Sequence, residues 1–232
     1  MKILWASLLL FSTSLPAQKQ ERQILTYNIA LGAISAGVGA VINKPKHADW
    51  KRYIVKGIWQ GSIGGLINYS GKKTLYLINK KNELGYAWPA KILHAAGTSI
   101  IENAALNEPF LRNWNIDIGP ARIDFSTSCS KKIRARFLPG SIYAILKGSR
   151  RGKMDWQTTF RTGTISYYST NYIASNNSFP AAGLSYGRGI IYSDYGGNTN
   201  NILAHELAHT FQYRDYMVLN SFLKPLATKL RK

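Results

Sequence analysis

The sequence predicts an α+β protein with glycine-ridged helices toward the amino terminus, a small antiparallel sheet, and a helix carrying an HExxH motif near the carboxyl end. Three observations favour this class. Small residues recur every four positions in the first third of the chain, apolar and polar residues alternate after Trp114, and helix-forming residues surround positions 205–209. A spacing near 3.6 residues is typical of helices, and a period of two is typical of half-buried strands.

The composition bounds the class of protein. The chain has 232 residues, 45% of them hydrophobic, so it has enough apolar material for a core, and disordered and collagen-like classes are excluded. Cys129 is the single cysteine, which excludes an intramolecular disulfide and any zinc site that needs two thiolates from one chain. A metal ion would therefore be held mainly by histidine and carboxylate groups.

The first residues predict export. Residues 1–17 have the pattern of a signal peptide, with Lys2 ahead of an apolar stretch and Ala17 as a small residue at the expected cleavage site. An uncleaved amino-terminal anchor is the alternative. The expected location is the periplasm or the cell envelope, with membrane association left open. The remaining chain divides into a helical region, 18–112, and a strand-rich region, 113–232.

The charge is strongly positive. There are 30 Lys+Arg residues against 11 Asp+Glu residues, a formal charge of +19, and removal of residues 1–17 takes away one lysine and leaves +18. In an exported protein this charge indicates anionic lipid or envelope material as a partner, and makes nucleic acid an unlikely one. Solubility and non-specific adhesion are the alternative explanation.

The small residues predict one tight helical hairpin. Residues 23–43 carry no charge, residues 54–69 form the second segment, and a polar stretch at 44–52 joins them. The small residues of the two ridges are Gly32, Ala36 and Ala40 in the first segment, and Gly57, Gly61 and Gly65 in the second. Such ridges let two helix backbones approach closely. A buried hairpin and a membrane-inserted hairpin both fit this pattern.

A third helix is expected over residues 89–106. Its apolar face would consist of Ile92, Leu93, Ala96, Ile100 and Ala104. The opposite, solvated face would carry His94, Thr98 and Glu102.

The strand-rich region predicts an antiparallel meander of short strands. Alternation is clearest at 115–119, 121–126 and 132–138, and Gly-Pro and Pro-Gly pairs separate these segments. Further strands are expected at 141–146, 158–168 and 189–193. A long surface loop is expected over 169–187, which is rich in Asn, Ser, Gly and Pro.

The HExxH motif carries the chemistry. His205 and His209 stand four residues apart in a segment of helix formers, so both imidazoles project from one face and can bind one zinc ion. Glu206 then faces a water on that ion and can act as general base. Leu203, Leu207 and Phe211 would hold the helix in the core. The alternative is a pair of helix histidines with no metal.

The segment Ile202–Gln212, ILAHELAHTFQ, resembles the LLAHELTHVVQ segment of bacterial metallopeptidase-like domains of the zincin type, in which a short strand also leads into the motif helix. The resemblance covers about 25 residues. It implies a zinc ion on His205 and His209, with Glu206 as base and a peptide or protein as substrate. In zincins the strand before this helix belongs to a sheet whose edge strand holds extended substrate, and Gly189–Ser193 is the expected counterpart.

The third metal ligand is open. Asp215 stands six residues after His209, where the metzincin group of zincins places its third ligand. Metzincins have a glycine three residues after the second histidine, at which the chain turns, and this sequence has Gln212 there. In a continuous helix Asp215 lies about 120° around the axis from His209. The other candidates are Glu102, His94 and Asp194. Because the set of metal ligands is incomplete, a second interpretation stays open: a non-catalytic envelope or membrane-associated protein with a vestigial or structural metal site.

Overall fold

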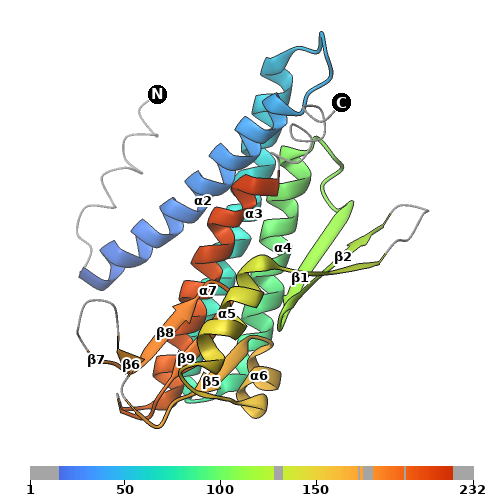
Figure 1. Cartoon of the computed structure of the whole chain (residues 1–232). Helices are drawn as coiled ribbons and strands as arrows, with labels where there is room; N and C mark the ends of the chain where they lie inside the picture. Colours follow the sequence, from blue (N-terminus) through green and yellow to red (C-terminus); the bar gives the residue numbers. More distant parts are fainter. Residues whose placement is uncertain (1–15, 128–132, 172, 175–179, 196, 222–232) are drawn as a thin grey trace.

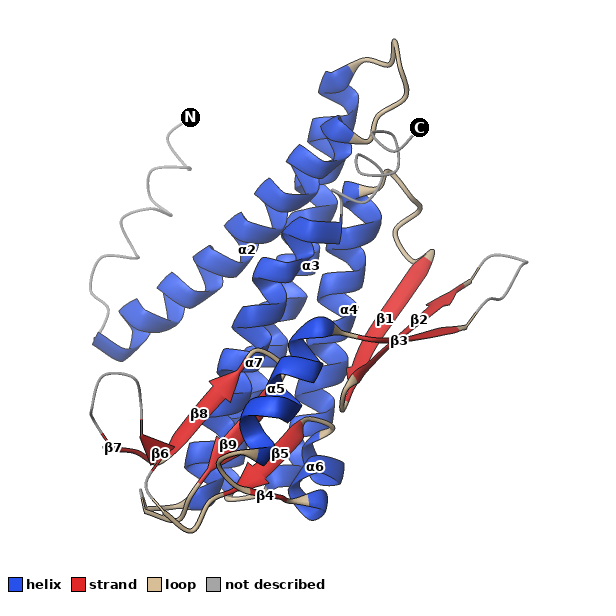
Figure 2. Ribbon diagram, viewed as in Figure 1, coloured by secondary structure: helices blue, strands red, loops and turns tan. Residues whose placement is uncertain are grey.

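The computed structural model describes residues 16–127, 133–171, 173–174, 180–195 and 197–221. It confirms the predicted α+β class, with long helices and small sheets (Figure 1, Figure 2). The helices form a bundle, and two small sheets lie against different parts of it (Figure 2). The predicted signal peptide falls almost entirely outside the described residues, and so does Cys129.

The predicted hairpin is present as α2 (Pro16–Ile42) and α3 (Trp50–Lys81), which run side by side and cross closely (Figure 1). A Cβ atom built on Gly61 would lie 2.2 Å from the carbonyl oxygen of Gly32, so only glycine fits at this contact. Asp49 begins α3 by accepting a hydrogen bond from the backbone N–H of Lys51 at 3.1 Å.

Within α2, Glu21–Ile42 is long and apolar enough to cross a membrane. Signal sequences and the core helices of soluble proteins meet the same criterion. Only 39% of its most apolar window is buried by the rest of the protein, so much of this helix faces outward.

The third helix, α4 (Ala87–Ala105), follows a short 3-10 turn, η1 (Leu84–Tyr86), and lies where the sequence predicts it. The predicted faces are wrong in part: Ile100 and Ala104 are buried as expected, but residues of the predicted solvated face are buried as well. His94 and Thr98 are fully buried, while Ile92 is 55% exposed. The reason is that small residues on this side admit α3 closely: a Cβ on Gly71 would lie 2.8 Å from the backbone nitrogen of His94.

The first sheet confirms three of the predicted strands. β1 (Asn113–Ile118), β2 (Ala121–Ser126) and β3 (Arg134–Phe137) form an antiparallel sheet in that order, with β1 packed on α4.

The second sheet differs from the expected meander because it is mixed. Its order is β4 (Lys153–Met154), β5 (Ile165–Tyr168), β9 (Gly189–Tyr192) and β8 (Gly183–Tyr186), and β5 pairs with β9 in parallel. β9 is the strand expected before the motif helix. The expected loop at 169–187 contains β8 and the short pair β6 (Ile173–Ala174) and β7 (Pro180–Ala181).

One predicted strand is helical, and a second is helical in its first half. The strand expected at 141–146 is α5 (Pro139–Ser149), because Pro139 at the first turn presets the helical backbone and Gly148 lets the helix lie against the ring of Tyr167. The segment 158–168 divides: α6 (Trp156–Thr162) begins where Asp155 accepts from the Thr158 N–H at 3.0 Å, and Gly163 ends it in a left-handed conformation ahead of β5.

One apolar core joins the helical region to the sheet and to the last helix. It contains Leu75, Ile78, Leu84, Ala87, Ala90, Ile190, Tyr192, Leu203, Ala204, Leu207 and Phe211. A buried charge cluster reinforces this junction: Asp117 on β1 pairs with Arg188 from the β8–β9 turn and lies 3.5 Å from Arg214. Helix, sheet and motif therefore hold one another in place.

Candidate metal centre on the last helix

The HExxH motif lies on α7 (Thr199–Ser221), as predicted. The side chain of Asn198 accepts a hydrogen bond from the N–H of Asn200 at 2.9 Å, which caps the first turn. Asn200 in turn donates to the backbone oxygen of Asn82 at 2.9 Å, so the start of α7 is fixed to the end of α3. Leu203, Leu207 and Phe211 are buried, and the predicted anchoring of this helix in the core is confirmed.

The two histidines face each other on the exposed side of α7. Nε2 of His205 lies 3.0 Å from Nε2 of His209, and the ring planes are perpendicular. On the other side of the ring, Nδ1 of His209 lies 2.9 Å from Oε1 of Gln212. This oxygen can accept a hydrogen bond from Nδ1–H, which leaves the lone pair of the ring on Nε2. From the sequence, Gln212 was considered only because it stands in place of a glycine. Its position three residues after His209 on a helix could have indicated this contact.

The pair fits a metal ion with little movement. Two nitrogens bound to one tetrahedral ion at roughly 2.0–2.1 Å would be about 3.3 Å apart. The observed 3.0 Å is a few tenths of an ångström shorter than this spacing. The pKa of His205 is lowered by burial and by the nearby His209. Both effects favour the neutral imidazole, which is the form that binds metal.

Glu206 is held at the edge of the second sheet. It is 5% exposed, and burial raises its pKa to about 6. A Cβ atom on Gly183 of β8 would lie 2.9 Å from Oε1 of Glu206, so this strand passes directly against the carboxyl group. Among the described strands β8 lies at the edge of this sheet, with β9 as its neighbour. Gly183 is a second site residue that the sequence analysis missed, in a segment assigned to a loop.

Two of the candidate third ligands, Asp215 and His94, bind each other inside the helical bundle. Asp215 is 3% exposed and accepts from Lys72, while Nε2 of His94 lies 2.9 Å from its Oδ1. Asn68 also donates to Asp215, at 3.4 Å. The positive partners keep the pKa of Asp215 below its usual value despite burial. Helix α7 continues past Asp215, so this carboxylate points into the bundle and away from the histidine pair.

The other two candidates are also partnered. Glu102 accepts two hydrogen bonds from the guanidinium of Arg122 and one from Asn115 at 3.1 Å. Asp194 accepts from the Tyr168 hydroxyl at 2.7 Å and from Thr199 at 3.2 Å. Within the described ranges, no three His, Cys, Asp or Glu side chains come together as a metal-binding group. The structure thus brings the two histidines together, keeps Glu206 on the same helix against β8, and adds none of the four candidates.

No family model matches this chain, and no match to it was found among curated proteins or among solved structures. The geometry of α7 and β8 is therefore the basis for assigning a function.

Proposed function

We propose that the protein is an exported zinc-dependent hydrolase of peptide bonds. The observation that carries the proposal is the pair of Nε2 atoms 3.0 Å apart on the exposed side of α7, with Glu206 next to them against an edge strand. Export rests on the signal-like pattern of residues 1–17.

His205 and His209 would hold the ion, and Gln212 would keep His209 in the tautomer that exposes Nε2. A bound zinc ion would supply an acidified water and polarise the scissile carbonyl. Glu206 would accept the proton of that water and later return it to the leaving amine. Its location beneath β8 shields the carboxyl group from solvent on one side.

The outer edge of β8, on which no described strand pairs, provides a place for an extended peptide. In the antiparallel pairing, Gly183 lies opposite Tyr192 and Ser185 opposite Ile190, while the N–H of Ser193 donates to Ala182 across the strands. Because hydrogen-bonded pairs alternate along such a ladder, the backbone groups of Gly183 and Ser185 point away from β9. A substrate strand that pairs with them would run past Glu206.

The rival function is a non-catalytic envelope protein. Its support is the lack of a third protein ligand within the described part of the chain. A catalytic zinc site has, as a rule, three protein ligands and one open position. The two functions differ in turnover, so they are separated by activity together with zinc binding.

The first test is zinc binding, measured by equilibrium dialysis at pH 7.5. We expect one zinc ion per chain, and His209→Asn should weaken binding by about a hundredfold because one of two imidazole ligands is lost. His47→Asn is the matched control: His47 is exposed and has a φ of 69°, a conformation that asparagine tolerates. A parent protein that takes up no zinc would overturn the proposal.

The second test is hydrolysis of a fluorogenic peptide library by the zinc-loaded protein. Glu206→Gln should retain zinc and lower kcat by roughly 10²–10⁴-fold, the usual contribution of a general base. Glu83→Gln, at an exposed position far along the chain from the motif, should change neither quantity. Zinc binding without hydrolysis by the parent would favour the non-catalytic rival.

A further inference from the structure

The outer face of α2 is apolar from Tyr27 to the end of the helix at Ile42. From Tyr27 to Ile42 every exposed position is uncharged, and the exposed side chains are Tyr27, Ala30, Ile34, Val38 and Ile42. Ile34 is 63% exposed. A helix on the surface of a soluble protein ordinarily carries charged residues there, so a continuous apolar stripe of this length indicates a surface that is covered by something else.

The outer face of α3 has the same character. Residues 57–71 contain no charged side chain, and the exposed positions among them are Ile58, Trp59 and Leu66. The stripes of the two helices adjoin at Gly37, because a Cβ atom there would lie 2.9 Å from Cγ1 of Ile58. The outer faces of α2 and α3 together form a surface that we call the hairpin face.

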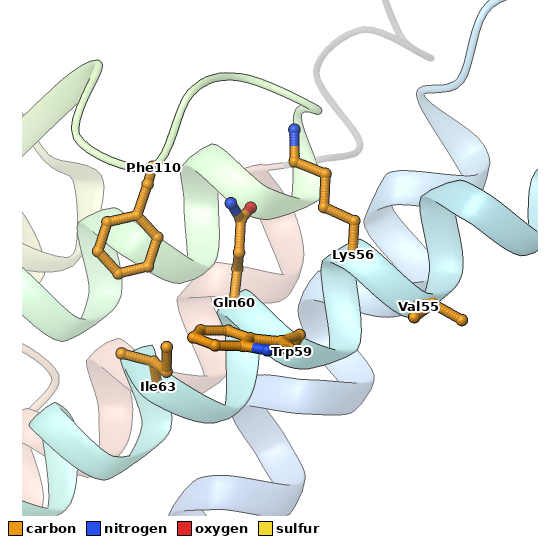
Figure 3. A pocket seen from close by; sticks show the side chains of 6 residues that line it. All are labelled: Val55, Lys56, Trp59, Gln60, Ile63 and Phe110. Atoms are coloured by element: carbon orange, nitrogen blue, oxygen red, sulfur yellow. The ribbon is translucent and has the colours of Figure 1, made fainter.

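An apolar groove of about 490 Å³ borders this face. Trp59 and Ile63 lie along α3 within it, and Phe110 reaches toward them from the segment that follows α4 (Figure 3). The side chain of Lys56 extends away from the Trp59 ring (Figure 3). This combination gives an apolar slot with an ammonium group at its rim.

The tip of the hairpin is basic. Residues 43–56 contain five basic side chains and a single carboxylate, Asp49, which caps α3. The basic residues are Lys44, Lys46, Lys51, Arg52 and Lys56. The tip lies at the far end of the bundle from the four-stranded sheet (Figure 1), so a partner bound there leaves the sheet uncovered.

We propose that the hairpin face docks on the surface of a bilayer that contains anionic phospholipids, with the apolar stripes in the interface and the basic tip on the head groups. Charge favours this occupant over a second copy of the chain, because two copies with a net charge of +19 each repel one another, whereas anionic head groups attract the basic tip. Apolar area and basic residues together are what an interfacial helix pair requires.

The hairpin lies on the membrane and does not cross it. The charge-free segment of α3, residues 57–71, spans about 22 Å at roughly 1.5 Å per residue, which is shorter than a hydrocarbon core of about 30 Å. The inner faces of both helices are occupied by their mutual contact and by α4.

The test is flotation of the full chain with vesicles of phosphatidylcholine containing 30% phosphatidylglycerol, compared with pure phosphatidylcholine. Two variants probe the two parts of the surface: Val55→Ser with Trp59→Ser, and Lys46→Gln with Lys51→Gln and Arg52→Gln. The first pair is 65% and 62% exposed, so the fold does not depend on it. Every variant retains residues 1–15, so any binding by that segment is common to all.

We expect binding to the anionic vesicles that weakens in 1 M salt, where screening is nearly complete. The triple lysine and arginine variant should bind roughly a hundredfold more weakly, about fivefold for each charge removed. The serine variant should bind at least about tenfold more weakly. The controls are Phe137→Ser for apolar exposure and Arg150→Gln with Lys153→Gln for charge, and these should bind as the parent does.

Three results would overturn the proposal. The first is no binding to anionic vesicles in 50 mM salt, and the second is equal binding by the hairpin variants and the parent. The third is a stable dimer, seen by sedimentation velocity, that the serine variant abolishes, because the hairpin face would then be covered by a second copy. None of these measurements involves zinc or a peptide substrate, so their outcome is independent of the proposed hydrolysis.

Discussion

Gly61→Ala should separate α2 from α3. The added Cβ would lie 2.2 Å from the backbone oxygen of Gly32 and 2.6 Å from Cβ of Ala36. An ordinary contact begins at 3.4 Å, so the helices must move apart by 3.4 minus 2.2, or about 1.2 Å, at this point. The obstacle is backbone, which cannot rotate aside as a flexible side chain does.

The expected net loss is about 2 kcal/mol of unfolding free energy. Overpacking costs about 1–3 kcal/mol, and a backbone obstacle places this site at or above the upper end. Alanine returns about 1 kcal/mol of helix propensity relative to glycine. For a chain of this length the loss corresponds to a Tm about 4–8 °C lower.

The assay is urea denaturation followed by circular dichroism at 222 nm. Ser62→Ala is the matched control: Ser62 lies next to Gly61 on α3, and its hydroxyl donates to the backbone oxygen of Ile58 in the same helix, at 2.8 Å. This variant should change the unfolding free energy by less than about 0.5 kcal/mol. If Gly61→Ala were as stable as the parent, the close crossing of α2 and α3 would be refuted.

Three further predictions concern buried charges. Asp215→Asn should lower the unfolding free energy by about 3 kcal/mol, since it leaves the ammonium of Lys72 without its counter-charge, while zinc affinity stays within about twofold. Glu102→Gln should also leave zinc affinity unchanged, and it should destabilise the protein because it weakens the paired hydrogen bonds between Glu102 and Arg122. A tenfold loss of zinc affinity in either variant would show that the replaced residue is a metal ligand. Burial lowers the pKa of Lys91 to about 7, so between pH 7 and about 10.4 the unfolded chain holds a proton that the folded chain has lost, and stability rises with pH. In this pH range the unfolding free energy of the parent should rise, relative to that of Lys91→Met, by up to about 1.4 kcal/mol per pH unit. Urea denaturation at several pH values measures both, and the same pH dependence in the two proteins would contradict the prediction.

The hairpin could be predicted from the sequence because its cause is local. Glycines at positions 57, 61 and 65 each weaken a helix by about 1 kcal/mol, so their recurrence at a helical spacing is unfavourable unless another backbone lies against them. That backbone is α2, whose Gly32 meets Gly61 and Gly65. Spacing alone could not show that the outer faces stay exposed, since this depends on where α4 and the sheets pack.

The faces of α4 could not be predicted because polarity was a poor guide to burial. Thr98 satisfies its hydroxyl within the helix, with bonds of 3.0 Å to the oxygens of His94 and Ala95, and so can be buried without an external partner. His94 stacks on Phe211, with ring centroids 4.4 Å apart, and reaches Asp215. Both partners lie about 120 residues further along the chain, where no local pattern could indicate them.

The spacing of Asp215 shows how one helix can carry both a candidate site and its own anchor. Positions 205, 209 and 212 fall on the side of α7 that faces outward, and position 215 falls on the side that faces α3 and α4. Had the chain turned after His209, the same carboxylate could have approached the ion. Because α7 continues, Asp215 instead fixes the helix to Lys72 and His94, and the rotation that this imposes keeps both imidazoles at the surface. None of the four candidate side chains then reaches the histidine pair, so the structure of the zinc-loaded protein would show what completes the site.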